Sequence, residues 1–485
     1  MSLDTDPGDQ LLPAAADLPP YGDDHAPDAA APRRRVPRKR PSQRRFWLRR
    51  VAVLTLLLAF AGTGWLAVSA VIARRALLRA QAGTALLRHD LTTGDVTAAA
   101  ARLAAVHRDA HRAHVLTTSV VWRIAGRVPV AGETPRTVRG LAYEADVLSA
   151  RVLPHFVTIA RTASGGGLRN GDRIDVGALR TMNAELTTLS AELDGVVRRT
   201  QALPSRSLLT PVAAGRQQLI TDTSALARTV AQLRDATSIA PGMLGADGPR
   251  RYFVALETNA ELRGSGGLIG AYAVMEVDNG QIRLTQLGSN KELRDTYPQP
   301  TPGLDPGFSA QYERFGADGF WLNSNMSADF PTVNRIWSSM YERTTGQHVD
   351  GSIAVDPIAL AQILKATGPA TTPSGESVGA DNIVPLTEQQ IYARFPAFAQ
   401  DAVRNDLQLQ IARSLYGRLV APVSHDVGLL PQLGAAAASG HIRIASNHPG
   451  EQAVLVRGAV GGALPATDGP YLQVAVNNAG GTKLD

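Results

Sequence analysis

Arg251 to Ile282 reads RYFVALETNAELRGSGGLIGAYAVMEVDNGQI, and this stretch decides the fold of the second half of the chain. Its two apolar runs, YFVAL (252–256) and LIGAYAV (268–274), have the length and composition of buried strands. Asp278-Asn279-Gly280 predicts a tight hairpin turn, because Asn and Gly accept the positive φ angles that such turns need. We therefore expect paired strands here, with the polar segment 257–267 between the first two.

Strand-like and helix-like runs alternate outward from this stretch, which predicts an α+β or mixed α/β domain over residues 245–485. The expected strands are 251–256, 268–277, 281–286, 351–355, 442–445, 453–456 and 471–476. The expected helices are 330–343, 357–365, 388–392 and 402–421. The final residues, 481–485, directly follow a strand-like run, so we expect this domain to be truncated at its C-terminus and the natural chain to continue.

The segment ETNAELRGSGG (257–267) carries chargeable side chains followed by glycines. Glycine lets a backbone approach a ligand closely, and Arg263 beside backbone N–H groups would suit an anion, phosphate above all. We take Asn259, Glu261 and Arg263 as candidate ligand-binding residues. The alternative is a structural turn with an internal Glu261–Arg263 ion pair. The spacing matches neither a P-loop nor a dinucleotide-binding fingerprint.

Two later segments offer further polar groups. GSNKELRDTYP (288–298) places Lys291, Arg294 and Asp295 at an expected strand end, where open α/β sheets bind ligands, although a solvated loop is the alternative. Asp329, in NSNMSADFP (323–331), is either a ligand-binding residue or the N-cap of the next helix, since Pro331 follows it closely. Serine-hydrolase and HExxH motifs are absent, and the lack of cysteine excludes disulfides and thiolate chemistry.

The stretch VAVLTLLLAFAGTGWLAVSAVIA (51–73) has 23 residues and no charge. As a helix at about 1.5 Å per residue it spans roughly 34 Å, enough for a hydrocarbon core of about 30 Å. A buried core helix would show a polar face, and a cleaved signal peptide would be shorter, so we expect one transmembrane signal anchor, 46–75 with its flanks. Ten Lys and Arg residues lie between Arg33 and Arg50, which predicts a cytoplasmic N-terminus and an extracytoplasmic C-terminal domain.

Residues 1–45 are rich in Pro, Ala, Asp and Arg, and we expect a disordered cytoplasmic tail because they lack the apolar residues of a core. Their basic part, RRRVPRKRPSQRR (33–45), is expected to contact anionic membrane lipid, with a cytoplasmic protein partner as the alternative. The net charge is +6, and the densest run of basic residues lies directly before the apolar stretch, while the chain after residue 50 is close to neutral. We therefore expect no nucleic-acid partner.

Residues 76–240 are expected to form a helical stalk, with helices at 76–89, 96–124, 133–162, 174–199 and 209–237. A heptad-like stripe in the fourth helix indicates a packed hairpin or bundle: Leu179, Met182, Leu186, Leu189, Leu193 and Val196. Asp175 is the expected N-cap of that helix.

Three histidines lie in HRDAHRAH (107–114) within this stalk. Spacings of four and three place His107, His111 and His114 on one helical face, which could hold a metal ion. No carboxylate motif accompanies them, and Arg108 and Arg112 add positive charge to the same helix. We interpret the segment as a solvated helix face and assign no metal site.

Three segments carry a family resemblance: 251–282, NSNMSADFPTVNRIW (323–337) and VDGSIAVDPIALAQILKATGPA (349–370). They resemble domain-of-unknown-function family 4012. The resemblance implies a membrane-anchored bacterial envelope protein, of actinobacterial or other origin, often associated with surface polysaccharides.

A weaker resemblance runs to the LytR-CpsA-Psr phosphotransferases, which move a glycopolymer from a polyprenyl-pyrophosphate carrier onto the cell wall. LRDTY (293–297) is similar to their P-R-D-T-Y segment, and Arg263 stands where one of their arginines would lie. The resemblance implies Arg294 and Asp295 as catalytic residues, with Arg263 and Arg294 neutralising pyrophosphate and Asp295 holding a metal or acting as base. Ser265 stands where that family has a metal-binding aspartate, so the cofactor stays open, with Mg²⁺ as the candidate.

Two functional hypotheses follow. The first is a phosphotransferase-like envelope enzyme. The second is a non-enzymatic protein that binds a polyprenyl-linked glycan, or that acts as a scaffold for envelope protein partners. We expect a role in cell-envelope polysaccharide assembly and leave enzyme status open.

Overall fold

The computed structural model describes residues 43–163, 167–206, 209–396, 398–420 and 426–478. Residues 1–42 of the expected tail and residues 479–485 at the end of the chain lie outside the described residues. The prediction that the natural chain continues beyond residue 485 concerns that end and also lies outside them. The described residues divide into two compact units at Gly62/Thr63. Helix α1 (Gln43–Thr92) contains this boundary.

Helix α1 is the one helix among the described residues that is long and apolar enough to cross a membrane, judged by length and composition alone. Its apolar side chains before residue 62 face outward, and Leu56 and Phe60 are 69% and 81% exposed. The helix that we expected at 76–89 is the last part of α1 and not a separate element. It ends at the expected break, where Gly94 has a φ of 78° that favours glycine.

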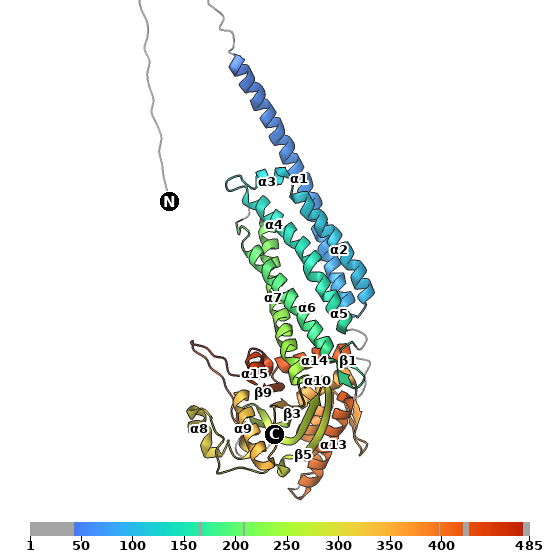
Figure 1. Cartoon of the computed structure of the whole chain (residues 1–485), viewed down its shortest axis with the longest axis vertical. Helices are drawn as coiled ribbons and strands as arrows, with labels where there is room; N and C mark the ends of the chain where they lie inside the picture. The colour runs from blue at the N-terminus through green and yellow to red at the C-terminus, as the bar shows by residue number, and fades with distance from the viewer. Residues whose placement is uncertain (1–42, 164–166, 207–208, 397, 421–425, 479–485) are drawn as a thin grey trace, which may run out of the picture. The chain divides into compact units, whose positions relative to one another are not determined.

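The stalk is a helical bundle, and Figure 1 shows its long helices running alongside one another. Small residues of α1 pack against the next helices, with Ala73 and Ala76 contacting Ala113 and Ala142. The predicted stripe is the core of the following hairpin, because Leu186, Leu189, Leu193 and Val196 are buried. The elements after α1 are α2 (Val96–Thr117), α3 (Val120–Ala125), α4 (Glu133–Val147), the π-helix η1 (Leu148–Val152), α5 (Leu153–Ala163), α6 (Val176–Gln201) and α7 (Thr210–Met243).

The C-terminal part is mixed α/β, as expected, around a seven-stranded sheet in the order β1-β2-β5-β4-β3-β6-β9. All pairs are antiparallel except β3 with β6. The strands are β1 (Arg169–Asn170), β2 (Arg173–Ile174), β3 (Arg250–Arg263), β4 (Gly266–Asp278), β5 (Gln281–Ser289), β6 (Gly351–Val355) and β9 (Ile442–Ser446). A separate small pair is β7 (Ala370–Thr371) with β8 (Ser377–Val378).

Helices cover both faces of the sheet. On one face, Phe253 of β3 packs with Trp321, Trp337 and Tyr341 in an aromatic core. On the other face lie α10 and α13, whose apolar side chains form a second core. The helical elements are η3 (Asn290–Glu292), α8 (Pro306–Tyr312), η4 (Glu313–Phe315), η5 (Trp321–Asn323), α9 (Phe330–Thr345), α10 (Pro357–Thr367), α11 (Ile383–Pro385), the π-helix η6 (Leu386–Gln390), α12 (Ile391–Arg394), η7 (Phe398–Gln400), α13 (Asp401–Val420), α14 (Asp426–Ala438), α15 (Pro449–Leu455) and η8 (Ala459–Gly461).

The predicted hairpin turn at Asp278-Asn279-Gly280 is confirmed. Asp278 pairs with Gln281, and both Asn279 and Gly280 have positive φ angles of 44° and 80°. The turn lies against β2, where the Ile174 N–H donates to the Gly280 carbonyl over 2.9 Å. Residues from the expected stalk therefore join the edge of the sheet.

The outer edge of β5 is closed partly by a side chain. Beyond its pairing with β4, β5 is paired with β2 only at Gln281. Further along, the Tyr416 hydroxyl of α13 accepts a hydrogen bond from the Leu284 N–H (3.0 Å) and donates one to the Ile282 carbonyl (3.2 Å). One phenol thus satisfies both a donor and an acceptor of this strand.

Two strand predictions are wrong. Residues 453–456 lie at the end of helix α15 and just after it, because Pro449 starts a helix there. Residues 471–476 have no regular structure, and their apolar side chains Leu472 and Val474 are exposed. In the stalk, the helix expected at 133–162 is interrupted by π-helix η1, and the helix expected at 96–124 breaks between α2 and α3.

Candidate functional site

The segment that we expected to be a loop, 257–263, continues strand β3, and only Gly264 and Ser265 form the turn to β4. The β3–β4 register shifts between Leu256 and Glu257 and again between Thr258 and Leu262, so this end of the strand pair is bulged. Gly266 has a φ of 145°, and a Cβ there would overlap with the Glu257 carboxyl. Gly266 therefore makes room for a buried acid.

Arg263 is buried, and its guanidinium links three backbone segments through hydrogen bonds. It donates to the carbonyl oxygens of Leu262 (3.0 Å), Leu322 (2.9 Å) and Asn478 (2.7 Å). Burial lowers the pKa of Arg263, and Glu261 opposes that effect. Three of its N–H groups are therefore used on backbone oxygens of three segments. Asn259 and Glu261 lie on the same strand, and Asn259 Oδ1 is buried with no hydrogen-bond partner among the described residues.

The candidate residues after β5 lie in the loop that follows that strand. Arg294 is exposed and Asp295 Oδ1 accepts a hydrogen bond from the Trp321 N–H over 2.9 Å. Since Arg263 bonds to the carbonyl of the next residue, Leu322, the structure brings Arg263 and Asp295 to one short 3₁₀ helix, η5. Lys291 points elsewhere and pairs with Asp401 at 3.1 Å.

Asp329 is the N-cap of α9. Its Oδ2 accepts hydrogen bonds from the Thr332 N–H (3.1 Å) and the Thr332 hydroxyl (2.6 Å), while its Oδ1 accepts one from the Leu464 N–H (3.1 Å). The capping alternative is thus what the geometry supports at this position. Asp175 and Asp356 cap α6 and α10 in the same way.

Two buried glutamates, which we did not select from the sequence, lie beside the candidate residues. Glu257 is 5% exposed and accepts a hydrogen bond from Asn325 Nδ2 over 2.9 Å. Burial raises the pKa of Glu257 to about 8, with Asp356 adding to the shift and Arg443 and Asn325 opposing it. Glu257 is therefore mainly protonated at neutral pH.

Glu388 approaches the same strand from π-helix η6. Its Oε2 accepts hydrogen bonds from the Thr258 hydroxyl (3.0 Å) and from the Ala260 N–H. Its Oε1 is buried with no hydrogen-bond partner among the described residues. Burial raises the pKa of Glu388, although these hydrogen bonds oppose the shift.

Glu257 and Glu388 are both among the residues that line a narrow pocket of about 60 Å³ between β3, β4, α10, η6 and α13, and the Glu257 carboxyl itself bonds to Asn325. Its walls are apolar, and its other polar groups come from Thr258, Thr387 and Gln408. Carboxyl groups with raised pKa values in an apolar pocket are a common mark of functional sites, and π-helices are often found at such sites. We take this Glu257–Glu388 pocket as the candidate functional site.

Only one of the two glutamates at this site could have been selected from the sequence. Glu257 stands directly after the apolar run 252–256 and inside the segment singled out above, so its burial was within reach of sequence reasoning. Glu388 comes from a helix far along the chain, and only the packing of η6 against β3 brings it here.

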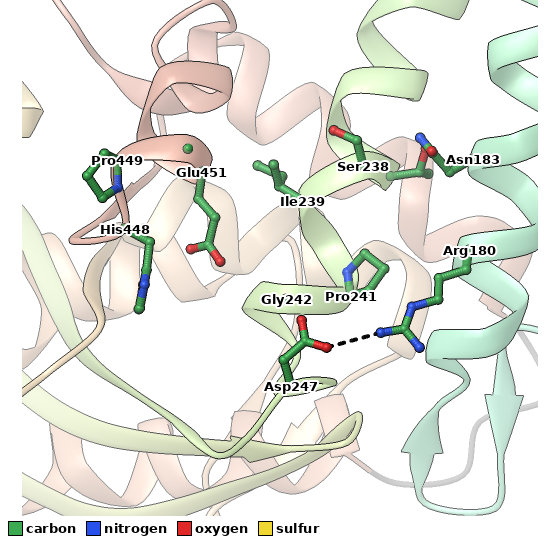
Figure 2. A pocket seen from close by; sticks show the side chains of 12 residues that line it. Arg180, Asn183, Ser238, Ile239, Pro241, Gly242, Asp247, His448, Pro449 and Glu451 are labelled. Carbon is green, nitrogen blue, oxygen red and sulfur yellow. Dashed lines mark hydrogen bonds and ion pairs between the residues drawn. The ribbon is translucent and has the colours of Figure 1, made fainter.

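A larger hollow of about 460 Å³ lies where α6, α7 and α15 meet (Figure 2). His448 and Glu451 lie on one side of it and Arg180 and Asn183 on the other, with Arg180 paired to Asp247 at 3.3 Å. Asp350, next to it, bonds to Arg250 (3.0 Å) and His448 (2.7 Å). Burial would raise the pKa of Asp350, but hydrogen bonds from the Arg251 N–H, His448 and Arg250 hold it below its usual value. These charges are paired with one another, so we assign this hollow a structural role.

Residues 247–392 match the model of a family described as a protein of unknown function, DUF4012. The match contains β3, β4, η6 and both glutamates of the pocket. No curated protein and no solved structure matches the chain significantly.

Proposed function

We propose that this protein is anchored in the cell membrane by α1 and that its α/β domain binds the sugar portion of a polyprenyl-linked glycan during envelope polysaccharide assembly. Helix α1 is long and apolar enough for one crossing. The ten basic residues that precede it favour a cytoplasmic N-terminus, which would place the rest of the chain outside and the basic tail on membrane lipid.

The observation that carries the binding proposal is the Glu257–Glu388 pocket. Sugars present hydroxyl groups that both donate and accept hydrogen bonds, with apolar C–H surfaces between them. The pocket offers carboxyl, hydroxyl and amide groups on apolar walls, and Glu388 Oε1 is a buried acceptor with no partner among the described residues. A hydroxyl of the ligand would satisfy that oxygen and remove the cost of burying it.

Binding is favoured over phosphotransfer because three of the side chains that a transferase would need, those of Arg263, Asp295 and Asp329, are engaged within the fold. Arg263 donates to three carbonyl oxygens, and Asp295 and Asp329 accept hydrogen bonds from backbone N–H groups. A guanidinium used in this way is a poor ligand for pyrophosphate.

The test is binding of a polyprenyl-pyrophosphate-linked disaccharide to the full chain in detergent, measured by native mass spectrometry. Bare polyprenyl phosphate is the comparison ligand. We expect tenfold weaker binding of the glycan-linked carrier, or a greater loss, in Gln408→Ala and Glu388→Gln, and little change in Glu313→Gln, whose side chain is exposed. Equal binding of both carriers, with a loss only in Arg294→Ala, would support the phosphate site instead.

Failure of the wild-type chain to bind either carrier would reject the glycan proposal. The scaffold function would then take its place, with envelope proteins as partners. Lipids that co-purify with the full chain provide an independent check, because a bound carrier survives gentle extraction and is identified by its mass.

A second candidate function, transfer or hydrolysis of the same glycan, rests on Glu257. A carboxylic acid with a pKa of about 8 is protonated at neutral pH and can act as a general acid. If the pocket is catalytic, incubation with the glycan-linked carrier releases a product that Glu257→Gln does not form. Unchanged carrier with intact binding assigns the pocket to binding alone.

A further inference from the structure

A cluster of imidazole and carboxylate groups lies in the stalk, separate from the pocket above. His114 Nδ1 is 2.7 Å and His111 Nδ1 is 3.2 Å from Asp146 Oδ2, and the ligating atoms of these three residues all lie within 4.8 Å of one another. His107 Nδ1, one turn earlier on α2, is 3.7 Å from Asp146 Oδ1 and 3.1 Å from the Ser149 hydroxyl. The carboxylate that the sequence pattern lacked therefore comes from the neighbouring helix α4.

The arrangement fits a tetrahedral metal ion. Ligand atoms at about 2.0–2.1 Å from zinc are about 3.3 Å apart in a tetrahedron, and His111 Nδ1 and His114 Nδ1 lie 3.2 and 2.7 Å from Asp146 Oδ2. Asp146 Oδ1 is buried with no hydrogen-bond partner among the described residues and lies 3.7 Å from His107 Nδ1. This oxygen is therefore left open to a ligand. Imidazole nitrogens with one carboxylate oxygen suit Zn²⁺, Ni²⁺ or Cu²⁺, whereas Ca²⁺ and Mg²⁺ prefer oxygen ligands alone.

The arginines of the same helix do not oppose this site. At 3.6 residues per turn, Arg108 and Arg112 lie about 100° around the helix from the histidines that precede them, and both side chains are exposed. The ring of His114 is held edge-on against Tyr143, with ring centroids 5.3 Å apart. The ligand positions are thus fixed on two packed helices.

We propose that His111, His114 and Asp146 form a transition-metal site, with Zn²⁺ as the ion and His107 beside it, that links α2 to α4 in the stalk. Such a site would act as a cross-link between two helices whose other contacts are mainly small side chains. Metal binding would then stabilise the folded stalk by mass action.

The experiment uses the full chain in detergent, without a histidine tag and stripped of metal by a chelator. Zn²⁺ is titrated against a colorimetric zinc indicator, and Co²⁺ is used separately because tetrahedral Co²⁺ absorbs strongly in the visible range. We expect one Zn²⁺ per chain, a rise in the thermal unfolding midpoint, and visible Co²⁺ bands. Asp146→Asn and His114→Ala should each weaken Zn²⁺ binding at least tenfold.

The matched control is His155→Ala. His155 forms a single histidine–carboxylate pair with Glu185 at 2.6 Å in the same stalk, so it has the same chemistry without further ligands. We expect it to bind Zn²⁺ as the wild type does. Absence of stoichiometric Zn²⁺, or unchanged binding in Asp146→Asn, would overturn the proposal. Circular dichroism verifies that each variant is folded. If His114→Ala does not fold, the result for the isosteric Asp146→Asn variant decides the test.

Discussion

One buried glutamate of the stalk and one of the α/β domain have opposite surroundings. In the stalk, Glu144 is buried but bonds to Arg199 through both oxygens, at 2.8 and 3.0 Å. In the α/β domain, Glu257 is similarly buried, yet it accepts its side-chain hydrogen bond from the neutral amide of Asn325. Glu144 therefore links two stalk helices through an ion pair, whereas Glu257 is buried with a pKa that burial raises to about 8. A buried carboxyl group can therefore serve as half of an ion pair between helices or stay neutral, as the proposed ligand site requires of Glu257.

The largest expected effect is a pH dependence of stability that Glu257 causes. The folded state holds this proton up to a pH of about 8, whereas the unfolded chain releases it near the ordinary pKa of 4.5. The contribution of the Glu257 proton to the free energy of unfolding is therefore complete below about pH 4.5. It falls by about 1.4 kcal/mol per pH unit above that and is lost once the pH has risen through 8.

Glu257→Gln cannot ionise, so its free energy of unfolding should lack this slope. Urea unfolding of the full chain in detergent, followed by tryptophan fluorescence from pH 4.5 to 9, measures the difference between the two proteins. Glu313→Gln is the control and should keep the wild-type slope. Parallel curves for wild type and Glu257→Gln would show that Glu257 is ionised in the folded state, and the contrast with the stalk would fall.

The next effect distinguishes the two arginines that the sequence suggested together. Arg263→Ala leaves three backbone carbonyls without their donor, and we expect a loss of about 3 kcal/mol in the free energy of unfolding. Arg294→Ala removes an exposed side chain and should change stability by less than about 0.5 kcal/mol. Similar losses for both, in the same unfolding assay, would contradict the structural role of Arg263.

The smallest effect compares an N-cap in each region. Asp356 is buried, accepts hydrogen bonds from the N–H groups of Ile358 and Ala359 at 3.0 Å, and pairs with His441 at 2.6 Å. Asp175 accepts one, from the Ala178 N–H at 2.9 Å. We expect Asp356→Ala to cost about 2 kcal/mol and Asp175→Ala about 1 kcal/mol. Thermal unfolding midpoints of the two variants rank them, and a reversed order would refute this reasoning.

Local sequence patterns predicted the elements whose stabilising contacts are local. The hairpin at Asp278–Gly280, the heptad stripe on α6 and the caps at Asp175 and Asp329 all depend on residues within one or two turns of chain. The prediction failed at 471–476, where an apolar alternating run finds no neighbouring strand among the described residues. Alternation shows that a segment could pair, but not that a partner is present.

The candidate site could be located from sequence only in part. The glycine-rich segment 257–267 is the right region, and the resemblance to a family of unknown function rests on it. The side chains that line the pocket could not be chosen, because Glu388 and Gln408 reach it from helices that pack only in the folded chain. For the same reason, Asp146 could not be matched with the histidines of α2.

The hydroxyl of Tyr416 has a consequence for how copies of this protein meet. It bonds to the Leu284 N–H and the Ile282 carbonyl, the groups to which a strand from another molecule would have to bond. Proteins confined to a membrane surface collide far more often than the same number in free solution. An open sheet edge there would favour strand pairing between many copies of the protein. In the proposed membrane setting, the Tyr416 hydroxyl prevents this stretch of the β5 edge from pairing with a strand of another copy.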